Sequence, residues 1–200
     1  MKEIIVQHKP DSISWEQLAT CHQHAHESNK SEGIRMLCAD YSAEELKKEV
    51  EKGICLVAID ENKNLLGTLS IVFRTYKSFY YTGDAAYICY VAVSPDYKGK
   101  GVYKALSQKA NQEISDRGVD MLYLHTHIKN KVAREAYQRD GYKLVRLIAT
   151  GGGANYYSVE MAKWIKGASP RKIFLKIIYI LSCIYIRFRY KPGHVKRFGI

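Results

Sequence analysis

The chain has 200 residues, of which 46% are apolar, and a formal net charge of +11. This size and composition are typical of one folded domain with an appendage. The charge does not indicate a nucleic-acid-binding domain, because residues 1–160 hold 21 Lys and Arg against all 20 acidic residues, whereas residues 161–200 hold 10 Lys and Arg and no acid. The basic character therefore belongs to the tail.

The cysteine usage and the first residues indicate an intracellular protein. The five cysteines are odd in number and never stand as Cys-x-x-Cys, so neither a disulfide framework nor a zinc ribbon is indicated, and a reducing cytoplasm fits best. Met1–Gln7 lacks the long apolar run and small-residue cleavage site of an export signal, so we expect Met1 to be the mature start.

The first 60 residues predict a strand, two helices and a second strand. In order, these are a strand within Lys2–Lys9, a helix from Ser14 to about Asn29, a helix from Ser42 through Val50, and a buried strand at Ile54–Ile59. Each helix start is a capping box, in which a serine is followed three residues later by Gln or Glu. Gly53 ends the second helix.

Strands and helices alternate after residue 60. The predicted elements are, in order, a strand at Leu65–Thr75, a loop around Lys77–Asp84, a strand at Tyr87–Val93, a helix at Val102–Arg117, a strand at Met121–Thr126, a helix at Asn130–Asp140, a strand at Tyr142–Ala149, a turn at Gly151–Gly153 and a strand at Asn155–Ala162. This order predicts an α+β fold in which helices cover a mixed sheet. Small residues and a proline at Gly167–Pro170 predict a boundary between a domain of residues 1–165 and a tail of residues 166–200.

A phosphate-binding loop is predicted where the strand ending at Val93 gives way to the next helix. Gly99 and Gly101 let the backbone turn there, so free N–H groups and the positive end of the helix dipole converge. Three lysines add charge that suits a pyrophosphate, namely Lys98, Lys100 and Lys104. No Ser or Thr follows Gly101 as a nucleoside-triphosphate loop requires, and a dinucleotide fingerprint would need glycine at Lys104. A glycine turn without a ligand stays open as an alternative.

One strand further on, a second motif has the pattern Asn-x-x-Ala-x-x-x-Tyr-x-x-x-Gly-Tyr. Its residues are Asn130, Ala133, Tyr137, Gly141 and Tyr142. With the glycine loop, this motif resembles the GNAT superfamily of acyl-CoA N-acyltransferases over roughly residues 2–162. The first family motif, Arg/Gln-x-x-Gly-x-Gly/Ala, is met at Gly101, while Lys98 and Tyr103 replace its ends. The resemblance implies a GNAT-like, mostly antiparallel mixed sheet with helices on both faces.

The resemblance also implies a site for acetyl-CoA as cosubstrate. The residues that would hold it are those of the loop, Lys98, Gly99, Lys100, Gly101, Val102 and Tyr103, those of the preceding strand edge, Val91 and Val93, and Asn130 with Ala133. Tyr137 would protonate the departing thiolate, a transfer that needs the site to bring a thiol pKa of about 8.5 and a phenol pKa of about 10 together. A tyrosine that only packs a helix is the alternative.

The base that deprotonates the acceptor amine is less evident. No carboxylate lies on Tyr87–Val93, where many family members place a glutamate, so the candidates are His125 and His127 on one strand face, or the helix group His22, His24 and His26. His22 and His26 share a helix face but no third ligand is evident, so no metal is expected. Polar residues within His22–Tyr41 suit a small-molecule amine acceptor such as a nucleotide-linked or lipid-linked amino sugar.

The tail predicts an amphipathic helix over residues 171–191. Apolar residues recur on one side at Phe174, Ile178, Leu181, Tyr185 and Phe188, and basic residues gather on the other at Lys172, Lys176, Arg187 and Lys191. The uninterrupted apolar run, Ile177–Ile186, has ten residues, whereas a membrane span needs roughly twenty. We expect this helix to lie on an anionic membrane surface. Packing on its own domain or in a homodimer stays open, and nucleic acid is not expected as a partner.

These features predict a cytoplasmic N-acetyltransferase that is peripheral to the inner face of the membrane and transfers acetyl directly to a primary amine within a ternary complex. Two alternatives from other classes stay open. One is a non-catalytic acyl-CoA-binding module, and the other is a membrane-recruited adaptor. The sequence does not specify the acceptor, the acyl length or the base.

Overall fold

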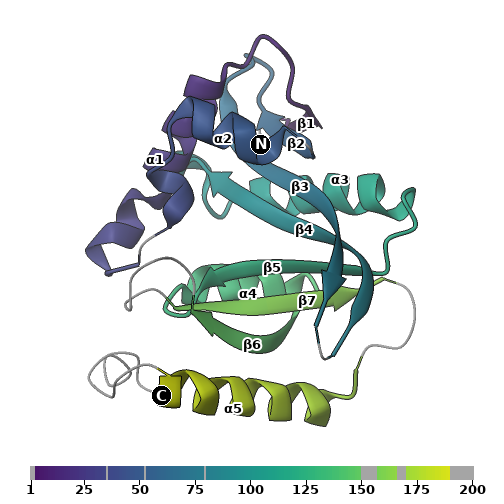
Figure 1. Ribbon diagram of the computed structural model, residues 1–200. Coiled ribbons are helices and arrows are strands. Elements are labelled where there is room, and N and C mark those ends of the chain that lie inside the picture. The colour runs from purple at the N-terminus through teal and green to yellow at the C-terminus, as the bar shows by residue number, and fades with distance from the viewer. Residues whose placement is uncertain are drawn as a thin grey trace. The chain divides into compact units, whose positions relative to one another are not determined.

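The computed structural model describes residues 3–34, 36–51, 53–78, 80–149, 157–165 and 170–189 (Figure 1). The chain divides into two compact units, residues 1–119 and residues 120–200. Every predicted helix and strand is present in the predicted order, and two short 3-10 helices are added. The glycine turn predicted at residues 151–153 and the boundary predicted at residues 167–170 lie outside the described residues, apart from Pro170.

The first unit is an antiparallel sheet of four strands in the order β1-β2-β3-β4. Its elements are β1 (Ile5–His8), α1 (Trp15–Ser31), η1 (Leu37–Ala39), α2 (Ala43–Val50), β2 (Ile54–Ile59), β3 (Leu65–Lys77), β4 (Thr82–Val93), η2 (Pro95–Tyr97) and α3 (Val102–Ser115). Both predicted capping boxes are confirmed: the Ser14 and Ser42 hydroxyls accept from the third helical N–H, and the Gln17 and Glu45 side chains accept in return from the serine N–H.

The β3–β4 hairpin is longer than the sequence predicts. Residues 77–84 were expected to form a loop, but Lys77 pairs with Thr82 and Thr75 with Asp84. The turn is confined to Ser78–Tyr81, where the Ser78 N–H donates to the Tyr81 carbonyl over 2.8 Å. Strand pairing thus overrides the turn-like composition of Thr82-Gly83-Asp84, because each paired residue satisfies backbone groups that a loop would leave to water.

Helices lie on both faces of this sheet, with α1 and α2 in front of it and α3 behind it in Figure 1. Val57 and Ile59 of β2 pack with Leu18 of α1 and Leu46 of α2 in one apolar cluster. A Cβ atom at Gly67 of β3 would lie 2.6 Å from the Ala92 carbonyl and 3.0 Å from the Val102 side chain. Glycine is therefore needed at residue 67 for β4 and the start of α3 to approach β3.

The second unit has three antiparallel strands in the order β5-β7-β6. Its elements are β5 (Met121–His127), α4 (Lys131–Arg139), β6 (Lys143–Ala149), β7 (Tyr157–Trp164) and α5 (Lys172–Arg189). The C-terminal helix α5 runs alongside β6 (Figure 1), and the Ser182 hydroxyl of α5 accepts from the Leu147 N–H of β6 over 2.8 Å. Because β6 ends the order of this unit, α5 covers a strand edge that would otherwise expose backbone donors.

The face by which α5 packs differs from the predicted apolar stripe. Leu175, Ile178 and Ile186 are buried, whereas Phe174, Leu181 and Tyr185 of the stripe are 42–66% exposed. The difference arises because the helix is apolar around most of its circumference, so periodicity alone did not select the buried side. None of the described helices has the length and apolarity needed to cross a membrane.

Candidate active site

The glycine loop joins β4 to α3 within the first unit. Gly99 has φ 77° and Gly101 has φ 87°, in the left-handed region that favours glycine, and Gly101 is the N-cap of α3. A Cβ atom at either glycine would have no atom within 4 Å, so the space beside the loop is open. Among the described residues, the N–H groups of Gly99, Gly101 and Val102 have no hydrogen-bond partner. Such a loop at a helix N-terminus fits the pyrophosphate of coenzyme A.

The lysines of the loop differ in what they contact. Lys98 Nζ donates to the Ala25 carbonyl of α1 over 2.8 Å and lies 3.4 Å from the Ser28 hydroxyl. Lys100 lies over the Tyr97 ring, 5.3 Å from its centroid, and Lys104 is exposed on the first turn of α3. Lys98 therefore ties the loop to α1, and we expect Lys100 and Lys104 to be the lysines that bind an anion.

Strand β4 carries a bulge just before the loop. Ser70 pairs with Cys89 and Thr68 pairs with Ala92, so Tyr90 and Val91 together stand opposite one residue of β3. Tyr90 has φ 50°, which is unusual for a residue with a side chain. A bulge interrupts the ladder and re-aims backbone groups at the strand edge, Val91 and Val93, where the family resemblance implies that acetyl-CoA is held. The run Cys89-Tyr90-Val91 contains no glycine, so no local residue indicates the bulge.

The bulge also brings a carboxylate to β4. The Tyr90 hydroxyl donates to Glu49 Oε2 of α2 over 3.0 Å, and its ring lies 6.0 Å from Tyr41 and edge-on to His22 at 6.3 Å. Burial raises the pKa of the Tyr90 phenol above its ordinary value, so this hydroxyl stays protonated. Glu49 was not among the predicted site residues, because a contact between residues 41 positions apart leaves no local pattern.

In the second unit, His125 is part of a buried ion-pair cluster. His125 Nε2 lies 3.0 Å from Glu160 Oε2, and Arg146 binds both oxygens of the same carboxylate at 3.0 and 3.2 Å. Since a carboxylate accepts, Nε2 carries the proton in the neutral ring and Nδ1 is its basic nitrogen. The Glu160 side chain is 1% exposed and that of His125 is 27% exposed. An oriented and accessible imidazole of this kind suits a general base.

His127 has a different environment on the same strand. It is 1% exposed, and its Nδ1 accepts from the Lys129 N–H over 3.2 Å. Burial, with a smaller effect of the Lys129 charge, lowers the pKa of His127 to about 4. The neutral ring thus uses its lone pair within the fold, so of the two histidines on β5 only His125 suits a base.

The pKa of His127 predicts a pH dependence of stability. Between about pH 6.5 and 4 the unfolded chain binds a proton at His127 that the folded chain does not, so the free energy of unfolding falls as the pH is lowered through this window. His127→Gln should reduce this slope by about 1 kcal/mol per pH unit. Urea unfolding at pH 7, 6, 5 and 4.5 measures it, and an unchanged slope would contradict a buried neutral His127.

The second motif lies on α4. Asn130 is the N-cap, and its Oδ1 accepts from the Ala133 N–H over 3.1 Å. Tyr137 is 8% exposed, and its ring packs edge-on against Tyr142 at 6.1 Å. The spacing of the motif therefore has a local structural cause, since Asn130 begins the helix and Gly141, with φ 93°, follows its end.

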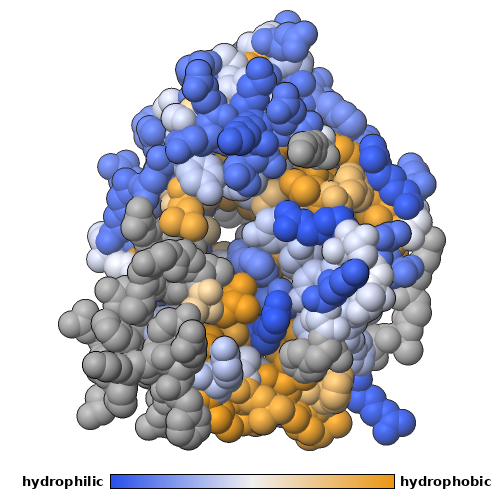
Figure 2. Space-filling model, viewed as in Figure 1, coloured by the Kyte–Doolittle hydropathy of each residue, from blue (hydrophilic) through white to orange (hydrophobic). Residues whose placement is uncertain are grey.

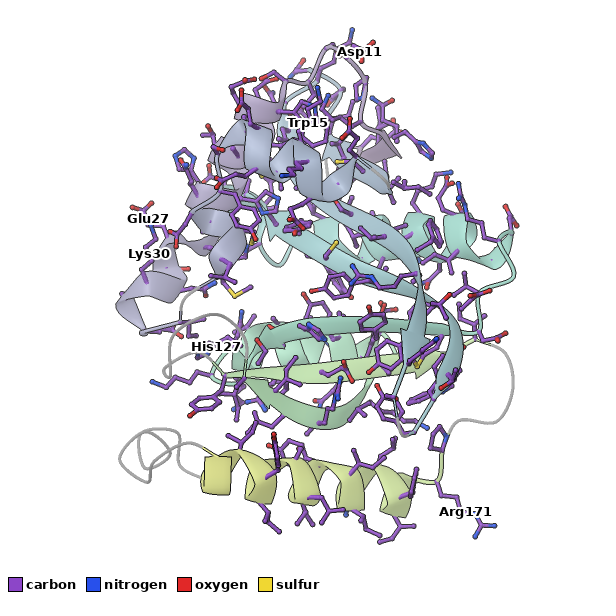
Figure 3. The ribbon with its side chains drawn as sticks, in the orientation of Figure 1. Asp11, Trp15, Glu27, Lys30, His127 and Arg171 are labelled. Carbon is purple, nitrogen blue, oxygen red and sulfur yellow. The ribbon has the colours of Figure 1, made fainter. Side chains whose placement is uncertain are left out.

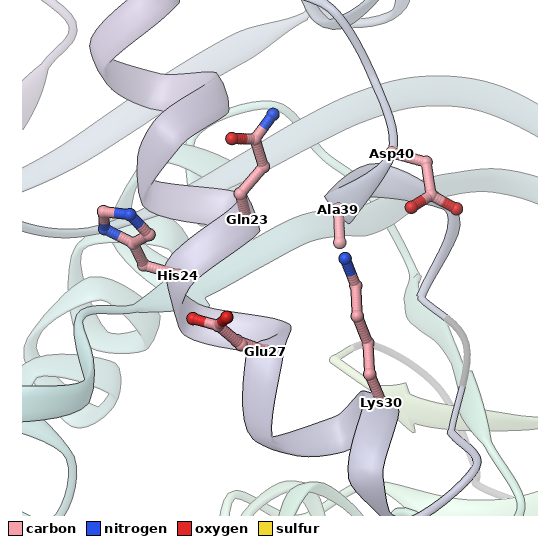
Figure 4. Close-up of a pocket in the computed structure, with 6 residues that line it drawn as sticks. All are labelled: Gln23, His24, Glu27, Lys30, Ala39 and Asp40. Atoms are coloured by element: carbon pink, nitrogen blue, oxygen red, sulfur yellow. The ribbon is translucent and has the colours of Figure 1, made fainter.

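The histidines of α1 separate into two groups. His22 and His26 are buried, whereas His24 lines an open polar hollow of about 500 Å³ between α1 and η1 (Figure 4). The other residues that line the hollow are Gln23, Glu27, Lys30, Ala39 and Asp40. Figure 3 shows Glu27 and Lys30 at the outer side of α1, and in Figure 4 the Lys30 side chain extends toward Ala39. This surface falls within the His22–Tyr41 segment that the sequence assigns to the acceptor.

The glycine loop at the start of α3 and the Asn-capped helix α4 are the two motifs by which the chain resembles the acyl-CoA N-acyltransferase class. A profile of the acetyltransferase (GNAT) family matches residues 15–142. The chain therefore belongs to the GNAT acetyltransferase family, as the sequence motifs predicted.

Solved structures agree with this assignment. NAA60 of Arabidopsis thaliana in complex with a bisubstrate analogue is 22% identical with a TM-score of 0.65, covering 83% of this chain and 100% of that chain. A GNAT-family acetyltransferase from Staphylococcus aureus is 16% identical with a TM-score of 0.63, over 82% and 100%. The ribosomal-protein-S18-alanine N-acetyltransferase from Escherichia coli is 19% identical with a TM-score of 0.57, over 84% and 98%. At these low identities, the TM-scores show a common fold. No curated protein matches the chain in sequence.

Proposed function

We propose that this protein is an N-acetyltransferase that transfers an acetyl group from acetyl-CoA directly to a primary amine. The observation that carries the proposal is the pair of left-handed glycines, Gly99 and Gly101, which leave the N–H groups at the start of α3 without protein partners beside open space. A structure of Arabidopsis thaliana NAA60, which is similar in fold, was solved in complex with acetyl-CoA. The family membership of the chain supports the same cosubstrate here.

We assign the parts of the cosubstrate to the following residues of the chain. The loop amides and Lys100 bind the pyrophosphate, and the β4 edge at Val91 and Val93 holds the pantetheine arm. Asn130 uses its Oδ1 on the Ala133 N–H, so its Nδ2 is the group that remains for the cofactor. Acetyl-CoA supplies the acetyl group as an activated thioester.

The transfer needs one base and one acid. We assign the base to His125, whose Nδ1 accepts the proton of the acceptor ammonium while Glu160 holds the ring. The amine nitrogen then forms a bond to the acetyl carbon as the carbon–sulfur bond breaks. Tyr137 donates its proton to the departing thiolate, and the proton that the new amide nitrogen then loses returns to the Tyr137 phenolate through solvent. General acid or base catalysis of this kind contributes about 10²–10⁴-fold in rate.

The acceptor we propose is a small polar amine such as an amino sugar, free or linked to a nucleotide or lipid. The support is the composition of the hollow between α1 and η1: the carboxylates of Glu27 and Asp40 suit an ammonium group, and Gln23 and His24 suit hydroxyl groups, while the Lys30 ammonium in the same hollow offsets part of the negative charge. Binding near two carboxylates would also keep the acceptor charged until a base removes its proton.

Release of free coenzyme A thiol tests the proposed activity. The protein is incubated with acetyl-CoA and a panel of amines that includes amino sugars, their nucleotide-linked forms and peptides with free N-termini. The proposal expects thiol release that depends on an amine and is largest with an amino sugar. Cofactor binding without release would favour the non-catalytic acyl-CoA-binding module instead, and release with peptides alone would overturn the amino-sugar assignment while preserving the enzyme.

We further propose that α5 holds the protein on an anionic membrane surface at the cytoplasmic side. The face of α5 turned away from β6 exposes a set of apolar side chains, which Figure 2 shows gathered over this helix. They are Ile173, Phe174, Ile177, Ile180, Leu181, Ile184 and Tyr185, each 42–66% exposed. Residues 161–200 add 10 basic residues and no acid, so the charge favours anionic lipid over a second copy of the same basic tail. The five cysteines, all free thiols, support a reducing compartment.

Vesicle co-sedimentation tests this location. The full chain should bind vesicles that contain phosphatidylserine, bind neutral vesicles weakly, and dissociate as salt is raised. Ile177→Glu with Leu181→Glu should abolish binding, whereas Val132→Glu, at a 79% exposed apolar residue of α4, should not. No vesicle binding, together with a dimer in light scattering that the α5 variant dissociates, would overturn the lipid assignment in favour of a second copy.

A further inference from the structure

Three buried side chains of the first unit meet where α1 packs against η1. His22 and His26 stand one turn apart on α1, and η1 places Cys38 beside them. One ligand atom of each residue lies within 4.8 Å of the others. The three side chains are 1%, 8% and 8% exposed, so they belong to the interior. The sequence predicted no metal because no third ligand was evident beside the two histidines, and Cys38 supplies that ligand from 12 residues beyond His26.

Two nitrogens of this cluster lack hydrogen-bond partners. Among the described residues, His22 Nδ1 and His26 Nε2 are buried and have no partner at hydrogen-bond distance and angle, although the Val91 carbonyl faces the His26 ring. A buried polar atom in this condition costs about 1–3 kcal/mol, and most such atoms in folded proteins are satisfied. Aromatic packing accounts for the ring positions, since His22 stacks on His26 at 6.1 Å, but not for the unsatisfied nitrogens. A ligand that accepts both lone pairs would account for them.

The protonation states suit a metal ion. Burial lowers the pKa of His22 to about 3 and that of His26 to about 4, so both rings are neutral at pH 7 and keep a lone pair. Burial raises the pKa of the Cys38 thiol to about 12, which makes the thiol inert unless a cation displaces its proton. Two neutral imidazoles and one thiolate form a donor set that Zn²⁺ prefers, with a fourth position left for water.

We propose that His22, His26 and Cys38 bind a zinc-type divalent transition-metal ion that ties η1 to α1. Binding releases the thiol proton of Cys38 to solvent as the metal–sulfur bond forms. Tetrahedral zinc sites place ligand atoms roughly 3.3–3.7 Å apart, so the side chains must close in slightly from their present spacing. The same two elements, α1 and η1, line the polar hollow, and the metal would therefore fix the shape of that surface.

Some residues around the cluster favour metal binding, and others oppose it. Asn29 Nδ2 lies 3.1 Å from His26 Nδ1, and a half-turn of this amide would let its oxygen accept from Nδ1–H, which frees Nε2 for the metal. The Lys98 ammonium and the Val91 carbonyl also face His26. Lys98 opposes a cation, and the carbonyl competes for the ring proton. These contacts predict binding weaker than that of a dedicated four-ligand structural site.

Metal titration of the full-length protein tests the proposal independently of acetyl transfer. The chain is freed of metal with a chelator at pH 7.5, then titrated with Zn²⁺ by calorimetry and with Co²⁺ by absorption. The proposal expects one equivalent of each metal, a thiolate-to-cobalt charge-transfer band, and a higher melting temperature with zinc. Cys38→Ser should abolish that band and weaken zinc binding at least 10-fold, and His26→Gln should weaken binding by a similar factor.

Matched variants on the same helix serve as controls. Cys21→Ser changes another buried thiol of α1, and His24→Ala changes the histidine that lies outside the cluster. Both should bind metal as the unchanged protein does. A wild-type protein that shows no charge-transfer band, or a Cys38→Ser variant that keeps it, would overturn the proposal. If Cys38→Ser fails to fold, the wild-type spectrum and His26→Gln still decide the outcome.

Discussion

Tyr137→Phe is expected to lower kcat for acetyl transfer about 100-fold or more, with little change in the KM for acetyl-CoA. The substitution removes only the phenol oxygen, because the ring of Tyr137, 8% exposed, keeps its packing against Tyr142. If the hydroxyl donates the proton that the departing thiolate takes, its loss raises the barrier of the chemical step and not the binding of the cosubstrate. Steady-state thiol release measures both constants.

Tyr142→Phe is the matched control for this variant. Tyr142 lies in the same aromatic pair and is 4% exposed, and burial raises the pKa of its phenol well above the ordinary value. The family motif accepts Phe or Tyr at this position, so kcat should stay within about threefold. Equal losses in the two variants would show that Tyr137 only packs α4 and would contradict its role as the acid.

Arg146→Ala is expected to lower the free energy of unfolding by about 2–4 kcal/mol. The guanidinium binds both oxygens of Glu160, whose side chain is 1% exposed, and its removal leaves a buried carboxylate with fewer partners. Removing one partner of a fully buried pair costs about 3–5 kcal/mol, and the 31% exposure of Arg146 lowers that figure. Urea unfolding followed by circular dichroism measures the change.

Lys163→Ala provides the comparison for a more exposed pair. Lys163 Nζ lies 3.4 Å from Asp140, and both side chains are more than a fifth exposed, so its loss should cost under about 1 kcal/mol. Replacing Arg146 and Glu160 together by Met should destabilise less than Arg146→Ala alone, because no charge remains buried. If the double variant is the least stable of the three, the uncompensated-charge explanation is wrong.

Local signals predicted much of the fold. The capping boxes at Ser14 and Ser42 lie within four residues of the helix starts that they specify, so no distant contact is needed to read them. The same holds for Gly99 and Gly101, because a left-handed turn before a helix depends on the glycines themselves. The positions of Tyr137 and Asn130 on α4 also followed from their own spacing.

Features that depend on pairing between distant segments were not predicted. The β4 bulge at Tyr90 arises from the register against β3, and nothing in the local residues marks it. The contact of Glu49 with Tyr90 and the placement of Cys38 beside His26 depend on how α2 and η1 pack. Helix α5 has apolar residues on nearly all sides. Its sequence therefore did not indicate that the buried face is the one that carries Ser182 and Ile178.

Two further predictions of the sequence, besides those proposed above, stay predictions. The boundary between residues 165 and 166 is not decided by the two compact units, which divide instead after Val119. The pyrophosphate role of Lys98 likewise stays a prediction, because the Lys98 ammonium donates to the Ala25 carbonyl of α1.

Thermal melting with and without acetyl-CoA tests most directly whether the glycine loop is a cosubstrate site. At a hundred times the dissociation constant, binding adds about 2.7 kcal/mol, which raises the melting temperature by on the order of 5–10 °C for a chain of this length. Gly101→Val should abolish the shift, because a side chain at φ 87° strains the turn and fills the space beside it, whereas Gly118→Ala, at φ 70° after α3, should retain it. A wild-type protein whose melting temperature does not change with acetyl-CoA would contradict the assignment of this loop.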